Sequence, residues 1–145
     1  EPVLEGHGLA MDGGALGGKP LLYIGASTIS LRRRLAHHLA DDSQRSTFRM
    51  SLGAVLSDTL ELRLRACSHP QFFGFERDCE ARLTSWMACN LLVATRSATS
   101  PAILERRLIR SQDPTLNING RRRRQSAWSL LMLRRRCLTQ AGGTM

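Results

Sequence analysis

The run Leu21-Leu22-Tyr23-Ile24-Gly25 is compact and apolar and ends at a glycine, which is the pattern of a short buried β-strand that leads into a turn. Residues 12–20 before it are rich in turn-forming Gly, Asp and Pro, and residues 8–11 supply a second short apolar stretch. We therefore predict a β-hairpin at the start of the chain, with residues 21–25 as its second strand.

Two helices and a strand are predicted next. Ser30 is a good N-cap, because its hydroxyl can accept from an unpaired backbone N–H, and leucines recur at every fourth residue after it. A second helix begins near Thr47, where apolar residues follow the spacing of a buried helix face. Residues 60–66 then alternate between apolar and charged side chains, which predicts a strand with one face in water.

The rest of the body adds a helix over residues 78–90, a short strand over residues 91–95 and a last helix that begins at Ser100-Pro101. Pro114 follows and stops that helix. We predict an α+β fold with a small antiparallel sheet, of about three strands, flanked by helices.

Length and charge divide the chain into two parts. Its 145 residues are enough for one hydrophobic core, and its formal net charge is +9. Seven arginines lie beyond Gly120 in a stretch without Asp or Glu, and residues 1–120 carry 14 basic and 12 acidic side chains. We predict a domain over residues 1–120 and an arginine-rich tail over residues 121–145. The tail is either a basic amphipathic arm that contacts phosphates or a membrane surface, or a partly disordered extension.

The four cysteines form no CxxC pair and no regular framework, which favours a reduced protein and argues against a zinc site. No apolar run approaches the roughly 18 to 20 residues of a membrane span. We therefore expect a cytoplasmic protein with no membrane partner.

Several motifs occur in a fixed order along the body. Tyr23-Ile24-Gly25 is followed by a helix that carries Leu31-Arg32-Arg33-Arg34-Leu35 and His38, and later by Glu105, Leu108-Ile109, Pro114 and Leu116-Asn117. This order over about 110 residues resembles the GIY-YIG nuclease superfamily. Within it, the chain is more similar to bacterial, largely uncharacterised members than to repair or homing enzymes. The resemblance implies a metal-dependent DNA endonuclease.

The resemblance also implies roles for three side chains. Glu105 corresponds to the family's metal-binding carboxylate and would hold Mg²⁺ or Mn²⁺. Arg34 corresponds to the arginine on the scissile phosphate, with Arg33 as the alternative, and Tyr23 to the tyrosine that orients or activates the attacking water. These residue types suit phosphodiester hydrolysis, which needs a nucleophilic water and neutralisation of charge on the phosphoryl oxygens.

Three more expectations complete the site. His38 stands where relatives carry His or Tyr, and would shuttle a proton or contact the phosphate. Asn117 would brace the site through hydrogen bonds, and Arg32, Arg33 and Arg34 would bind nucleic acid.

The first tyrosine motif of the family departs from its pattern. Its nearest candidate is Gly8-Leu9-Ala10, with Ala10 where the first tyrosine belongs. This departure supports an alternative function, a catalytically degenerate domain that acts as a DNA-binding or protein-interaction module.

Overall fold

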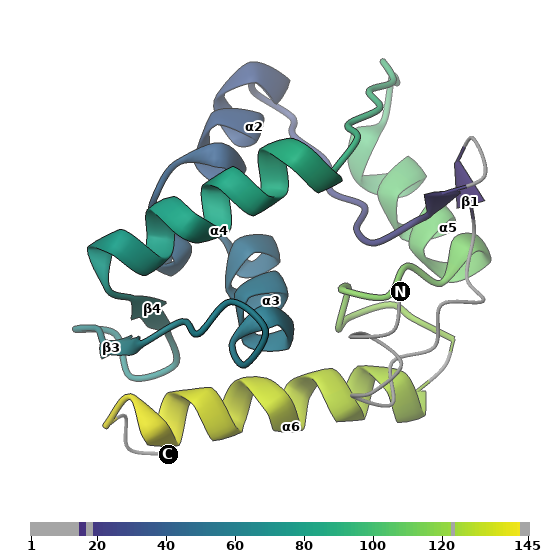
Figure 1. The fold of residues 1–145 in the computed structure, drawn as a ribbon. Coiled ribbons are helices and arrows are strands. Elements are labelled where there is room, and N and C mark those ends of the chain that lie inside the picture. The colour runs from purple at the N-terminus through teal and green to yellow at the C-terminus, as the bar shows by residue number, and fades with distance from the viewer. Residues whose placement is uncertain (1–14, 17–18, 123, 143–145) are drawn as a thin grey trace.

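A computed structural model describes residues 15–16, 19–122 and 124–142 of the chain. The elements follow one another as β1 (Ala15–Leu16), β2 (Lys19–Pro20), α2 (Leu31–Leu39), the 3-10 turn η1 (Ser43–Arg45), α3 (Thr47–Leu56), β3 (Leu64–Ala66), β4 (Phe73–Phe75), α4 (Arg77–Asn90), α5 (Pro101–Gln112) and α6 (Arg124–Gln140). Together they form an α+β fold, as predicted (Figure 1).

Helix α3 forms the centre of the molecule, between α4 on one side and α6 on the other (Figure 1). Every residue from Phe48 to Leu56 is buried, including the polar Arg49 and Ser51. Gly53 is needed at the middle of this helix, because a Cβ there would lie 2.3 Å from the ring of Phe75 on β4. The close approach of helix and strand fixes the core on which the other elements pack.

Helix α6 is part of this core. Leu130 and Cys137, seven residues apart and therefore on one face of the helix, are 0% and 2% exposed and belong to the same buried cluster as Met50 of α3. The expectation of a partly disordered tail is therefore wrong for residues 124–140. The predicted boundary at Gly120 separates an arginine-rich segment by composition, while the hydrophobic packing continues across it.

The sheets are smaller than predicted. In the described part of the chain, β1 pairs with β2 and β3 pairs with β4, each pair antiparallel, so about three strands in one sheet is more than the structure shows. Residues 21–25 do not form a strand. Their backbone is instead held by the segment after α5, since Leu116 N–H donates to Leu22 O at 2.7 Å.

Local signals placed the helices well. Ser30 caps α2 by accepting from Arg33 N–H at 3.2 Å, and α4 and α5 lie within one or two residues of their predicted bounds. The predicted strand over residues 91–95 is wrong. Leu92 and Val93 are 75% and 58% exposed and have no strand partner among the described residues.

Candidate active site

The segment Tyr23-Ile24-Gly25 is anchored by Asn117. The Asn117 side chain is buried and bonds both backbone groups of Ile24: its Oδ1 accepts from Ile24 N–H and its Nδ2 donates to Ile24 O, each at 2.9 Å. A side-chain amide used in this way replaces the neighbouring strand that residues 21–25 lack. Asn117 thus holds the backbone from which the adjacent Tyr23 side chain projects.

Glu105 reaches the same segment from α5. Its Oε1 accepts from Ala26 N–H at 2.9 Å, directly after Gly25, and the side chain is half-buried. The other carboxylate oxygen makes no hydrogen bond within the described residues. One oxygen of Glu105 therefore orients the carboxylate, and the second is available to a ligand.

Arg34 meets Tyr23 from α2. Arg34 Nη2 donates to the Tyr23 phenol oxygen at 3.3 Å, while Arg34 Nε is buried and has no hydrogen-bond partner among the described residues. Gly25 makes this approach possible, because a Cβ there would lie 2.9 Å from Tyr23 Cε1 and 3.3 Å from both Nε and Nη2 of Arg34. The glycine of the motif is thus explained by the space that the tyrosine ring and the guanidinium need.

Arg32 and Arg33 lie elsewhere on α2. Both side chains are exposed, and neither makes an ion pair in the described part of the chain. Of the three consecutive arginines, only Arg34 contacts Tyr23 in the described part of the chain. The geometry therefore favours Arg34 over Arg33 as the arginine of the site.

His38 lies one helical turn after Arg34 and packs against Tyr23 and Phe48. Its ring centroid is 5.6 Å from each of theirs, in edge-on contacts, and Tyr23 packs on Phe48 at 5.0 Å. Burial, followed by the positive charge of Arg34 and the nearby His37, lowers the pKa of His38 to about 4. His38 is therefore neutral at pH 7.

The hydroxyl of Ser46 contacts His38 Nδ1 and so influences which His38 nitrogen carries the proton. Ser46 Oγ caps α3 by accepting from Arg49 N–H at 3.0 Å and lies 2.7 Å from His38 Nδ1. Since Ser46 already accepts from the helix, its own proton is free to be donated to Nδ1. This arrangement favours the tautomer with the proton on Nε2. That nitrogen is buried and unpartnered among the described residues.

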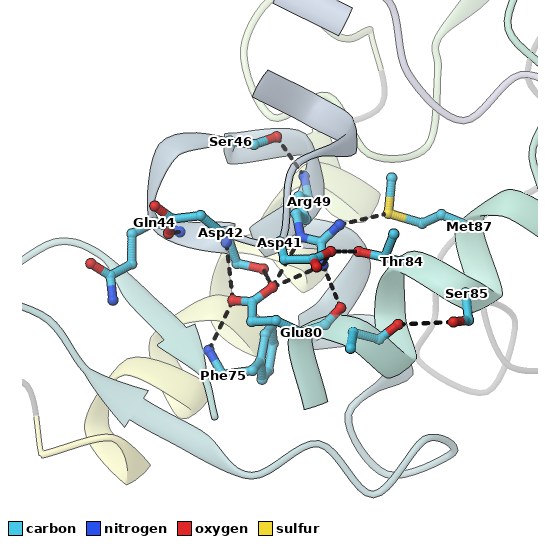
Figure 2. A network of polar contacts seen from close by, with 12 residues as sticks. Asp41, Asp42, Gln44, Ser46, Arg49, Phe75, Glu80, Thr84, Ser85 and Met87 are labelled. Atoms are coloured by element: carbon cyan, nitrogen blue, oxygen red, sulfur yellow. Dashed lines mark hydrogen bonds and ion pairs between the residues drawn. The ribbon is translucent and has the colours of Figure 1, made fainter. Parts of the chain in front are cut away.

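Beneath Ser46 lies a buried polar network that sequence reasoning missed (Figure 2). Arg49 and Glu80 are 0% and 2% exposed and joined by a hydrogen bond of 3.0 Å from Arg49 Nε to Glu80 Oε2. The backbone N–H groups of Ser43 and Phe75 donate to Glu80 Oε1 at 3.0 and 3.2 Å, so the carboxylate ties η1, α3 and β4 together. An arginine inside an otherwise apolar helix was the available signal, because such a charge requires a buried partner.

The site contains one carboxylate suited to a metal ion. No group of three or more His, Cys, Asp or Glu side chains gathers for a metal within the described residues. Mg²⁺ commonly keeps several waters and takes one or two protein carboxylates together with substrate phosphate oxygens. Glu105, half-buried and with one oxygen unbonded, fits that kind of site.

A family model described as the GIY-YIG catalytic domain matches residues 15–136. The chain belongs to the GIY-YIG family. No curated protein and no solved structure matches it. The family is one of nucleases that generally depend on a divalent metal ion, and it implies DNA as the substrate.

The extent of the GIY-YIG match bears on both ends of the chain. It reaches residue 136 and so includes most of α6, in agreement with the packing of that helix. It begins at residue 15, after Gly8-Leu9-Ala10, and that candidate for the first tyrosine motif also lies outside the described residues. The described helices include none long and apolar enough to cross a membrane.

Proposed function

We propose that this GIY-YIG protein is a metal-dependent DNA endonuclease whose active site is built from Tyr23, Arg34, His38, Glu105 and Asn117. One observation carries the proposal. Two donors on the same side of α2, Arg34 Nε and His38 Nε2, are buried beside Tyr23 without a hydrogen-bond partner in the described part of the chain. Buried polar groups are rarely left unpaired, and phosphate oxygens would satisfy both once the side chains above them move aside.

The charges of the site suit an anionic substrate. Arg34 supplies a guanidinium that can face phosphoryl oxygens, and its Nη2 bond to Tyr23 OH leaves the phenol proton free for a water or a phosphate oxygen. His38 is neutral and presents N–H at Nε2, so it acts as a hydrogen-bond donor without adding charge. The exposed Arg32 and Arg33 would contact the neighbouring phosphates of the strand.

Glu105 would hold Mg²⁺ or Mn²⁺ through its free oxygen while Oε1 remains bonded to Ala26 N–H. The ion, when bound, neutralises charge on the phosphoryl oxygens and lowers the pKa of bound water. Tyr23, the one tyrosine of the sequence, would orient the attacking water. Hydrolysis adds the oxygen of that water to phosphorus and breaks the bond to the departing deoxyribose oxygen, which takes up a proton.

Plasmid cleavage tests the proposal. Purified protein is incubated with supercoiled plasmid in Mg²⁺, in Mn²⁺ and with chelator, beside the variants Glu105→Ala and Glu105→Gln. Glu105→Gln is the matched control for folding, because the amide oxygen can still accept from Ala26 N–H while the charge that would bind metal is lost. We expect metal-dependent nicking by the wild type and none by either variant.

The alternative is a degenerate domain that binds DNA or a protein without cleaving. The sequence places Ala10 at the nearest candidate for the first tyrosine, which favours this reading. Folded wild-type protein that retards DNA and leaves the plasmid intact in both metals would establish the degenerate binder instead. A cytoplasmic location and a bacterial source stay predictions from the sequence.

A further inference from the structure

A shallow groove lies on the solvent side of α5, away from Glu105. It has a volume of about 600 Å³ and is lined by Ile103, Arg106, Arg107, Arg110, Ser111 and Arg122. Arg106 and Arg110 are four residues apart and therefore neighbours on the helix surface. Glu105 instead points from the inner side of α5 toward Ala26. The groove is thus a separate feature from the candidate active site.

The four arginines of the groove have no counter-charge among the described residues. None of them makes an ion pair with a carboxylate in the described part of the chain, and their side chains are exposed. Like charges four apart on a helix repel each other and destabilise the helix. The repulsion among the four arginines is offset when an anion binds in the groove.

The fourth arginine is brought to the groove by a specific clamp at the end of α5. Asp113 adopts the left-handed conformation there, with φ 48°, and its Oδ1 accepts from Arg121 Nε at 3.2 Å and from Arg122 N–H at 3.1 Å. Gly120 turns the chain with φ +81°, against Ile109 of α5. Arg121 is buried by this clamp, so the next residue, Arg122, is held at the edge of the groove.

We propose that this groove binds the phosphodiester backbone of DNA, at a contact separate from the candidate active site. Guanidinium groups bind phosphate oxygens in pairs of hydrogen bonds, and four arginine side chains that line an open groove can reach a row of phosphates rather than one small anion. The identity of the ligand rests on the proposed DNA substrate. The groove would hold DNA beside the site and carry no base-specific contact.

The test compares two double variants of equal charge. Arg106→Gln with Arg110→Gln removes two groove arginines. Arg65→Gln with Arg77→Gln removes two exposed arginines that form no ion pair with another described residue, at β3 and the start of α4, at the far end of the molecule from α5 (Figure 1). Glutamine is a good helix former and the α5 positions are exposed, so we expect both proteins to fold, which circular dichroism checks.

The measurement is fluorescence anisotropy of a labelled DNA duplex in chelator, repeated over a range of salt. For the groove variant we expect the slope of log K against log salt to fall by about 1.8, and Kd near 0.1 M salt to rise on the order of tenfold to a hundredfold. The control variant should stay within about threefold of wild type. A groove variant that binds like the control overturns the inference.

Binding in chelator separates this result from the nuclease proposal, because it needs no cleavage. Weakened binding by the groove variant with no plasmid cleavage by wild type would keep the groove and refute the nuclease. Metal-dependent cleavage by wild type with unchanged binding by the groove variant would keep the nuclease and refute the groove.

Discussion

Replacing Ser46 by alanine removes one hydroxyl that both caps α3 and bonds His38. Loss of an N-cap costs about 1 kcal/mol, and leaving a buried acceptor such as His38 Nδ1 unpaired costs about 1–3 kcal/mol. Because His38 is half-buried, we expect the lower part of that range and a total loss of about 2–3 kcal/mol in the free energy of unfolding. Urea denaturation measures this loss.

Ser30→Ala is the matched control. Ser30 caps α2 by accepting from Arg33 N–H, in an exposed position and without a contact to a histidine. The same chemical change there should cost about 1 kcal/mol, the value of the cap alone. The difference between the two variants measures the bond from Ser46 to His38.

Imidazole NMR tests the tautomer directly and does not depend on nuclease activity. In the wild type we expect the His38 proton on Nε2 and a pKa near 4. In Ser46→Ala the two tautomers should mix, while burial and the positive charges of Arg34 and His37 remain and keep the pKa of His38 below its ordinary value. Ser46→Thr keeps a hydroxyl and a cap and should restore the wild-type spectrum. A wild-type His38 protonated on Nδ1, or an unchanged tautomer in Ser46→Ala, would refute the reasoning.

Three further predictions concern the same region. Gly25→Ala should shift the Tyr23 ring and the Arg34 guanidinium and lower plasmid cleavage while the protein still folds, because the new Cβ would lie 2.9 Å from Tyr23 Cε1 and 3.3 Å from two nitrogens of Arg34. The free energy of unfolding should fall by at most about 3 kcal/mol as pH drops from about 6.5 to about 4, because His38 has a pKa of about 4 in the fold and takes up a proton first in the unfolded chain. Urea midpoints measured against pH test this, and His38→Gln should flatten their dependence on pH. Glu80→Gln should destabilise the protein by about 3–5 kcal/mol in urea denaturation, because it removes the buried partner of Arg49 and leaves only the exposed Asp41, 4.0 Å away, as a counter-charge.

Controls for these predictions lie close by in the chain. His37 is exposed, so His37→Gln should leave the pH dependence of stability as in wild type. Arg63 pairs with Glu76 at the surface, and Arg63→Met should cost far less than Glu80→Gln, since exposed pairs are solvated in the unfolded and the folded chain alike. Equal losses for the buried and the exposed pair would contradict the assignment of the buried network.

The helices were predictable from the sequence because their signals are local. Ser30 and Thr47 mark starts that the structure confirms, and α4 and α5 follow from apolar periodicity. Strand pairing is not local. Residues 21–25 are held by the backbone near Leu116, more than ninety residues away, and the apolar residues 91–95 find no strand partner among the described residues. No pattern within a short segment distinguishes these two outcomes.

Helix α6 was obscured by its composition. The arginines at both of its ends suggested a solvated tail, although the seven-residue spacing of Leu130 and Cys137 was visible as a narrow apolar face. Arg134 shows how such a helix packs, with its guanidinium about 3.8 Å from the sulfur of Met50 and its pKa lowered by burial. Long arginine stems cover apolar surface, so a basic run does not by itself predict a tail.

The candidate site, like the fold, was predictable from the sequence only in part. Motif order identified Tyr23, Arg34 and Glu105. It could not show what holds the Tyr23 segment in place, because Glu105 and Asn117 bond it from 79 and 93 residues away. The buried pair of Arg49 and Glu80 is the clearest case, with partners on α3 and α4.

That pair has a consequence for the chemistry of the site. A buried ion pair adds little net stability compared with apolar packing, so its value lies in fixing one arrangement. Here the Glu80 carboxylate holds Ser43 in η1, and Arg49 fixes the first turn of α3, so Ser46 between them has one position relative to His38. Variants that loosen the pair without unfolding the protein should therefore change the tautomer of His38 before they change the contact between Arg34 and Tyr23, which belongs to α2 and to the segment that Asn117 anchors.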